Sequence, residues 1–145
     1  MDRLAKAFLV IAAIGIPDAA YHAYDEITNY SAPGSNVCNI NHFFSCGSVF
    51  TSGYTTFLGV SMYVYGLVWF PLMLVLGYLF LSGAMGRNAR ADVLLLFLMV
   101  GNFFTLYLWY LELGVIHAIC PVCVSLYCLN YVLTGLSAYS LYRQA

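Results

Sequence analysis

Charge is what this chain has least of. Lys, Arg, Asp and Glu make up 8% of its 145 residues, and 63% of the residues are hydrophobic. A soluble domain carries about a quarter charged residues, so most of this surface must face a lipid bilayer rather than water. The sequence also lacks an internal repeat, a low-complexity tract and room for a second domain. We therefore expect one membrane domain, residues 1–145, without a nucleic-acid partner.

Long apolar runs account for most of the composition. Crossing the hydrocarbon layer takes about 20 apolar residues, and three runs reach or approach that length: 60–81, 93–111 and 115–142. A fourth run, 4–24, contains three polar or helix-breaking positions, Pro17, Asp18 and His22. It spans the membrane only if its polar groups face the interior of a bundle. A cleaved signal peptide is the alternative, because basic residues precede the run and small residues follow it.

The placement of the basic residues predicts the orientation. They stand before the first run, between the second and third, and after the fourth: Arg3, Lys6, Arg87, Arg90 and Arg143. With four spans these places lie on one side, which the positive-inside rule makes cytoplasmic. With three spans they would lie on opposite sides, which favours a retained first span. We expect a multi-pass cell-membrane protein with cytoplasmic N and C termini.

The expected fold is all-α, an integral membrane four-helix bundle with short links between antiparallel helices. The helices are predicted at about 4–25, 57–81, 91–112 and 118–142. An outer loop, 26–56, joins the first two. Within it we expect a short interfacial half-helix in 41–50, whose apolar side chains turn toward the membrane: Phe43, Phe44, Val49 and Phe50.

Four cysteines form two pairs on the outer face. Cys38 and Cys46 lie in the loop, and Cys120 and Cys123 form a Cys-x-x-Cys motif at the outer end of the fourth span. Disulfides persist in an oxidising compartment. Pro121 suits the first turn of a helix, and the amides and dipole there favour a thiolate, the form that attacks disulfides. Two dithiols on a membrane chain indicate an electron relay between soluble thiols and a lipid-dissolved acceptor.

Other uses of the cysteines are weaker. Zinc sites use closely spaced pairs, whereas seven residues separate Cys38 from Cys46, so we expect no metal. A non-catalytic protein stapled by two disulfides remains an alternative, although positions three apart close too small a loop to stabilise much. Cys128 is about 140° round the helix from Cys123. We interpret it as a buried small hydrophobe that faces away from the pair.

The fourth span continues below the Cys-x-x-Cys motif as one polar stripe. Its members step by three or four residues: Cys120, Cys123, Tyr127, Asn130 and Thr134. Polar groups at that depth need a partner. A bound quinone would accept hydrogen bonds from Tyr127 and Asn130, and contacts between helices are the alternative. Both stay open for Asn130, and the quinone is preferred for Tyr127. His117 either assists the thiols or is a solvated interfacial histidine, and the second reading is preferred.

Three stretches carry a resemblance to the vitamin K epoxide reductase family: 38–46, 47–59 and 120–130. They contain both cysteine pairs, Ser45 before the second loop cysteine, and the tyrosine and asparagine of the last helix. Together with the four-span plan, the likeness covers essentially the whole chain.

The resemblance implies a division of labour among the cysteines. Cys38 would take electrons from a thioredoxin-like soluble protein, Cys46 would pass them to Cys120, and Cys123 would deliver them to a membrane quinone of the menaquinone, ubiquinone or vitamin K type. The family also holds its quinone in the helix bundle beneath the half-helix.

Two positions depart from the animal epoxide reductases, which the resemblance brings in for comparison. Those enzymes place an acidic residue after the first loop cysteine, where this chain has Asn39. They also carry an asparagine on the second helix, where residues 60–65 offer Ser61 and two tyrosines. The departures favour a prokaryotic enzyme that supports disulfide bond formation. A vitamin K quinone or epoxide reductase running on dithiol electrons is the alternative.

Overall fold

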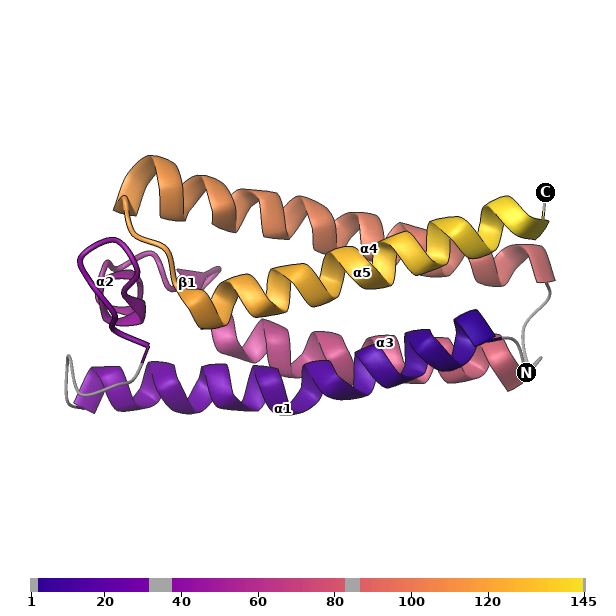
Figure 1. Ribbon diagram of the computed structural model, residues 1–145, viewed down its shortest axis with the longest axis horizontal. Helices are drawn as coiled ribbons and strands as arrows, with labels where there is room; N and C mark the ends of the chain where they lie inside the picture. Colours follow the sequence, from indigo (N-terminus) through magenta and orange to yellow (C-terminus); the bar gives the residue numbers. More distant parts are fainter. Residues whose placement is uncertain (1–2, 32–37, 83–86, 145) are drawn as a thin grey trace.

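Four long helices run along the long axis of the molecule (Figure 1). The computed structural model describes residues 3–31, 38–82 and 87–144. The helices are α1 (Arg3–Ser31), α3 (Met62–Ser82), α4 (Arg87–Tyr110) and α5 (Pro121–Gln144). A π-helical turn, η1 (Leu111–Ile116), extends α4. Each helix contains a stretch long and apolar enough to cross a membrane. The expected all-α four-helix bundle is confirmed, and the chain is a multi-pass membrane protein.

The bundle buries small and large apolar residues from all four helices. α1 packs against α3 and α5, and α4 packs against α5. The centre of this core contains Phe8, Ala12, Ala19, Phe70, Met73, Leu94, Leu98 and Leu133. Because three of these residues belong to α1, the first span is an integral part of the bundle. Outward-facing side chains such as Val68, Met99 and Phe103 are more than half exposed, as expected of a surface that lipid covers.

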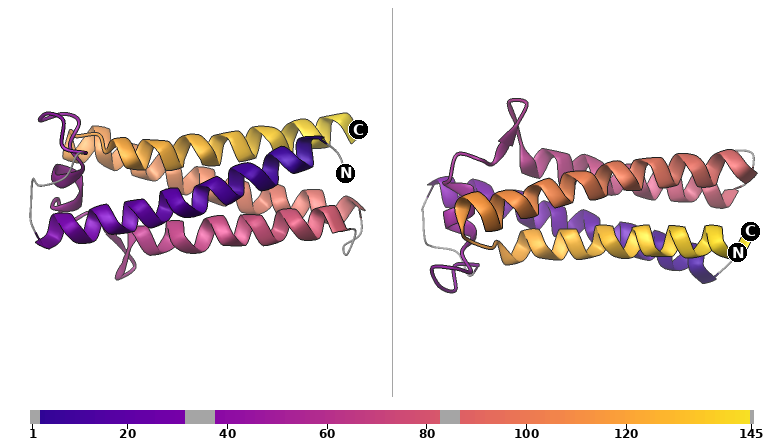
Figure 2. Two further views of the ribbon diagram at one scale, coloured as in Figure 1. Left: turned by 60° about the horizontal axis from the view of Figure 1, so that its bottom comes forward. Right: turned by 90° about the horizontal axis from the view of Figure 1, so that it is seen from above.

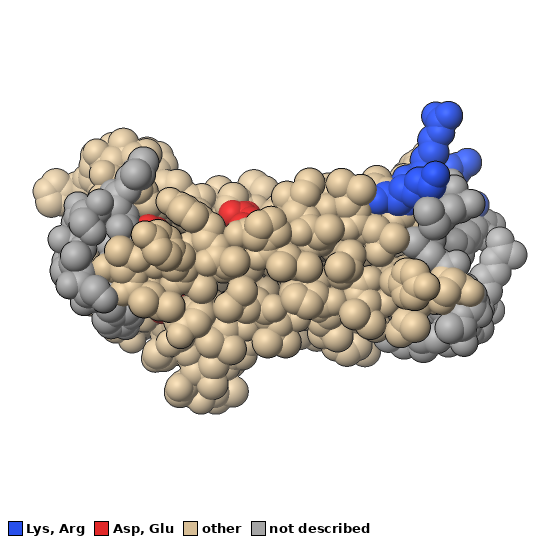
Figure 3. Space-filling model, turned by 90° about the horizontal axis from the view of Figure 1, so that it is seen from below, with Lys and Arg blue, Asp and Glu red and all other residues tan. Residues whose placement is uncertain are grey.

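The two ends of the bundle differ in charge. α1 begins and α5 ends at the same end, opposite the short helix α2 (Cys46–Phe50). Figure 3 shows Lys and Arg side chains gathered at this end, to which Arg3, Lys6 and Arg143 contribute. We call it the basic end, and the end that carries α2 the cysteine end.

Two helix boundaries differ by five residues or more from the sequence-based ones. α1 continues to Ser31 instead of ending near residue 25, because Asp25 and Glu26 are buried at the cysteine end, where α1 packs against α2. α3 starts later than residue 57, because a hairpin of β1 (Thr56–Phe57) and β2 (Val60–Ser61) precedes it and projects from the side of the bundle (Figure 2). Its two turn residues have φ of 53° and 79°, as tight hairpins require.

The half-helix of the outer loop is shorter than the 41–50 segment suggested. α2 comprises only the last five residues of that segment. Its own side chains Val49 and Phe50 are buried, whereas Phe43 and Phe44, which precede it, are exposed. The side chain of Asn41 accepts the amides of Phe43 and Phe44 at 2.9 and 2.8 Å. This local turn competes with helix formation, so the helix begins only at residue 46.

Candidate functional site

A backbone bridge aligns the two cysteine pairs. Ser45 donates its amide to the carbonyl of Ile119 at 3.0 Å, and Ile119 donates to Phe43 at 2.7 Å. The next residue on each side of this bridge is a cysteine. The bridge therefore sets Cys46 beside Cys120, with 3.1 Å between their sulfur atoms.

The loop pair is oxidised. Cys38 and Cys46 form a disulfide with Cα atoms 5.6 Å apart. Asn39, between them in sequence, accepts the amide of Gly47 at 2.8 Å and the hydroxyl of Ser45 at 3.0 Å. The Asn39 side chain thus holds the first turn of α2 next to the disulfide. Cys46 is fully buried, and Cys38 keeps 7% of its surface exposed.

The second pair is reduced, and Cys120 occupies the capping position of α5. The helix starts at Pro121, and the Cys123 amide donates to the Cys120 sulfur at 3.3 Å. Cys120 therefore accepts an amide of the first helical turn, as a capping side chain does. Cys120 and Cys123 are both buried free thiols.

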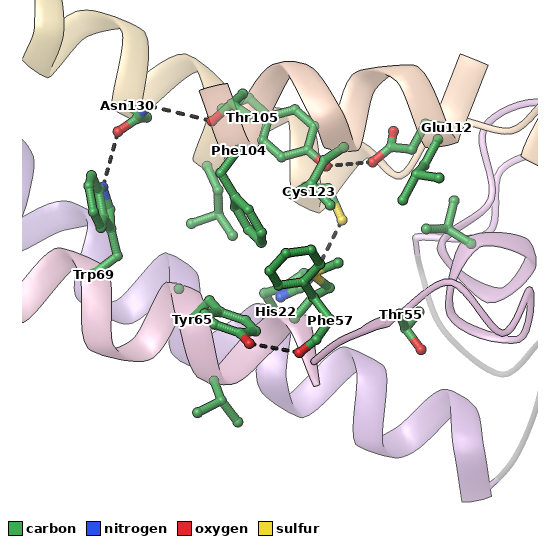
Figure 4. Close-up of a pocket in the computed structure, with 18 of the residues that line it drawn as sticks. His22, Thr55, Phe57, Tyr65, Trp69, Phe104, Thr105, Glu112, Cys123 and Asn130 are labelled. Atoms are coloured by element: carbon green, nitrogen blue, oxygen red, sulfur yellow. Dashed lines mark hydrogen bonds between the residues drawn. The ribbon is translucent and has the colours of Figure 1, made fainter. Parts of the chain in front are cut away.

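Cys123 meets a histidine from the first helix. The Nε2 atom of His22 lies 3.1 Å from the Cys123 sulfur (Figure 4). His22 is 5% exposed, and its ring stands edge-on to Phe50 of α2 at a centroid distance of 5.4 Å. The sequence marked His22 as a group that must face the bundle interior but gave it no role. His117, which was weighed instead, is exposed.

A buried carboxyl group joins η1 to α5. Glu112 is 3% exposed and accepts the Tyr127 hydroxyl at 2.7 Å on one oxygen. Its other oxygen accepts the Cys120 amide at 3.3 Å. One carboxylate therefore orients both the capping cysteine and the tyrosine beneath it. Single π-helical turns like η1 are frequent at functional sites, but nothing in the sequence marks this one.

A second buried carboxyl group comes from α1. Glu26 is 1% exposed, and no described residue hydrogen-bonds to either of its carboxylate oxygens. Buried polar groups without a partner are rare and call for an explanation. Both Glu26 and His22 border the cavity described next.

A cavity of about 510 Å³ lies within the bundle beneath α2. Cys123, Tyr127 and Asn130 of the polar stripe all line it, together with an aromatic group from the hairpin, α3 and α4 (Figure 4). The rings of that group lie 5.5 to 6.1 Å apart: Phe57, Tyr65 and Phe104. The volume is that of a small-molecule site, and the lining combines stacking surfaces with a few polar groups.

Helix-to-helix hydrogen bonds engage Asn130 at the inner end of the cavity. Its side-chain oxygen accepts the indole N–H of Trp69 at 3.0 Å, and its nitrogen donates to Asn102 at 3.0 Å. Asn102 donates in turn to Thr134 at 2.8 Å. Asn130 therefore links α3, α4 and α5, the contact that the sequence left open beside a quinone. The donor of Tyr127 is likewise engaged by a protein group, Glu112.

Two further expectations from the sequence concern the cysteines. Cys128 faces away from the stripe as expected, but it is exposed rather than buried, because that face of α5 lies on the outside of the bundle. The sulfur atoms of Cys38, Cys46 and Cys120 lie within 4.8 Å of one another, and Cys38 and Cys46 are joined in a disulfide.

A family model described as the vitamin K epoxide reductase family matches residues 6–138, nearly the whole chain. No curated protein matches the sequence.

Proposed function

The chain belongs to the vitamin K epoxide reductase family, and from that premise we propose that it is a quinone-dependent thiol-disulfide oxidoreductase. Membership makes it a membrane oxidoreductase. The proposal adds the route. A thioredoxin-like soluble protein gives the electrons, the two cysteine pairs relay them, and a membrane quinone receives them, which supports disulfide bond formation.

The observation that carries the proposal is the contact between the pairs. The sulfurs of Cys46 and Cys120 lie 3.1 Å apart although the two residues are 74 positions apart in the sequence. Disulfide exchange proceeds by attack of a thiolate on a disulfide sulfur, and reacting atoms start about 3 to 3.5 Å apart.

The relay can be written with its electrons balanced. The partner's dithiol reduces the loop disulfide through a mixed disulfide with Cys38, and the partner leaves oxidised. Cys46 then attacks Cys120 of a Cys120–Cys123 disulfide, which releases Cys123. Cys38 closes on Cys46 again and frees Cys120. Two electrons have now reached the α5 pair, and an oxidised loop pair beside a reduced α5 pair is the arrangement in the structure.

The last step re-forms the Cys120–Cys123 disulfide. Two S–H bonds break and one S–S bond forms, and a bound quinone supplies the acceptor for the two electrons and two protons. The cavity suits such a group. Its volume of about 510 Å³ can hold the ring, its aromatic lining can stack on the ring, and Cys123 borders it. We place Tyr127 and Asn130 against the quinone ring, with Tyr127 oriented by Glu112.

The distribution of charge supports the orientation of the relay. Basic residues gather at the end where α1 begins and α5 ends, so we assign both termini to the cytoplasm. The cysteine end then faces the oxidising side, where a soluble partner is available. Cys38 is the loop cysteine that keeps some exposed surface, which supports attack there, and the loop must move to widen that access.

Single-turnover kinetics test the proposal. A reduced thioredoxin-like protein is mixed with the purified full-length enzyme and a quinone, and quinone absorbance is followed. We expect quinone reduction in the wild type and its loss in Cys38→Ala, Cys46→Ala, Cys120→Ala and Cys123→Ala. Cys128→Ala is the matched control and keeps the activity. A wild type that neither oxidises the partner nor reduces the quinone contradicts the proposal.

A further inference from the structure

Resting on the proposed function, we propose that α1 supplies its proton route: His22 takes the thiol proton of Cys123, and Glu26 carries it onward. Of the two α5 cysteines, Cys123 is the one that lines the cavity. The Nε2 atom of His22 is in hydrogen-bonding contact with its sulfur, at 3.1 Å. An imidazole at that distance is a suitable proton acceptor, because one ring nitrogen accepts while the other donates.

Burial makes an internal acceptor necessary. Cys123 is 6% exposed and His22 is 5% exposed, so bulk water has little access to the sulfur. Two other ionisable groups near Cys123, Cys120 and Glu112, are less suited to take its proton. Cys120 must lose a proton of its own. The oxygens of Glu112 already accept the Tyr127 hydroxyl and the Cys120 amide.

The position of Glu26 makes it the next proton acceptor after His22. It follows His22 by four residues in α1, so the two side chains are neighbours on one face of the helix. Both line the cavity, and Glu26 lies one turn nearer the cysteine end. A carboxyl group with two unpartnered oxygens is otherwise unexplained there. A group that binds and releases a proton in each turnover accounts for it.

The step balances with the electron relay. The Cys123 S–H bond breaks, its proton moves to the Nε2 atom of His22, and the thiolate keeps the electron pair. Disulfide formation with Cys120 then removes two electrons from the pair, which pass to the quinone. His22 returns its proton to the reduced product, either directly or through Glu26, and the Cys120 proton completes the two that a quinol needs.

The first test needs no quinone. In the reduced full-length enzyme with EDTA present, the rate of Cys123 alkylation by a small maleimide is measured by mass spectrometry. His22→Gln keeps a hydrogen-bonding group of similar size but removes the proton acceptor. Because the thiolate is the reactive form, we expect alkylation to slow about tenfold. His117→Gln, an exposed histidine near the same pair, is the matched control and leaves the rate unchanged. A wild-type rate in His22→Gln overturns the proposal.

Rescue separates proton transfer from a structural role. His22→Ala leaves room for a small base, so added imidazole should restore much of the lost alkylation and of the quinone reduction, which falls about 100-fold without the base. Failure of imidazole to restore either rate, in a variant that unfolds like the wild type, contradicts a proton-transfer role.

The variant Glu26→Gln distinguishes the role of Glu26 from that of His22. It removes a carboxyl group near Cys123 but leaves the proton acceptor in place, so alkylation of Cys123 should be no slower than in the wild type. Quinone reduction over many turnovers should slow. Turnover at the wild-type rate removes Glu26 from the route. If the wild type reduces no quinone, the proposed function fails, and the alkylation experiment still decides whether His22 acts on Cys123.

Discussion

Replacing Asn130 by Leu tests how the inner end of the cavity is held together. The two side chains are similar in size, so the change removes hydrogen bonds rather than volume. It leaves the Trp69 indole N–H without its acceptor and the Asn102 oxygen without its donor, both of which lie at 3.0 Å. The weaker contact with Thr105 at 3.4 Å is lost as well.

The expected loss of stability follows from those bonds. Side-chain hydrogen bonds between membrane helices contribute on average about 0.6 kcal/mol each, so two contribute about 1 kcal/mol. A buried polar group left without a partner costs roughly 1 kcal/mol or more in addition. We therefore expect the free energy of unfolding of the quinone-free protein to fall by about 2 kcal/mol.

The assay is equilibrium unfolding in detergent micelles of the wild type, Asn130→Leu, Trp69→Phe and the double variant. A double-mutant cycle should give a coupling energy of about 0.6 kcal/mol between Asn130 and Trp69. If Asn130→Leu unfolds like the wild type and the cycle shows no coupling, the hydrogen bonds between the helices do not stabilise the bundle. Asn130 would then serve the ligand alone.

Further predictions concern packing and the buried carboxyl group. Gly15→Ala should destabilise the bundle by about 1 to 3 kcal/mol, because the added methyl group overlaps the ring of Phe70. Gly135→Ala is the control in thermal unfolding, and with nothing within 4 Å of the new atom it should stabilise by roughly 0.5 kcal/mol. Glu112→Ala removes the acceptor of two buried donors, so disulfide exchange between the pairs should slow, whereas Glu112→Gln, which keeps one acceptor, should be milder. Equal exchange rates in all three proteins would contradict the positioning role of this side chain.

The sequence carries most of the architecture because lipid imposes strict requirements. A chain with so few charges has few ways to cross a membrane, and the positions of its basic residues decide between three spans and four. The polar residues of the first run, His22 among them, already required a bundle interior. The boundaries at residues 31 and 62 depended instead on packing at the cysteine end, which local propensity does not report.

The site was less accessible from sequence, because its partners are far apart in the chain. The four cysteines were recognisable from their spacing and from the side of the membrane that the basic residues predict for them. His22 and Cys123 are 101 residues apart, and their contact depends on how α1 packs against α5. The stripe on α5 predicted that Tyr127 and Asn130 face inward, but their partners come from η1, α3 and α4. A helical stripe fixes a direction and leaves the neighbour unspecified.

The most direct test of the relay is to trap the exchange between the pairs. Cys38→Ala combined with Cys123→Ala leaves Cys46 and Cys120 without their usual partners, so gentle oxidation should join these two sulfurs, which lie 3.1 Å apart. Disulfide mapping by mass spectrometry should find the Cys46–Cys120 bridge in most molecules. Cys38→Ala combined with Cys120→Ala is the control and should form little bridge from Cys46. A double variant whose Cys46 and Cys120 remain unbridged would contradict the account.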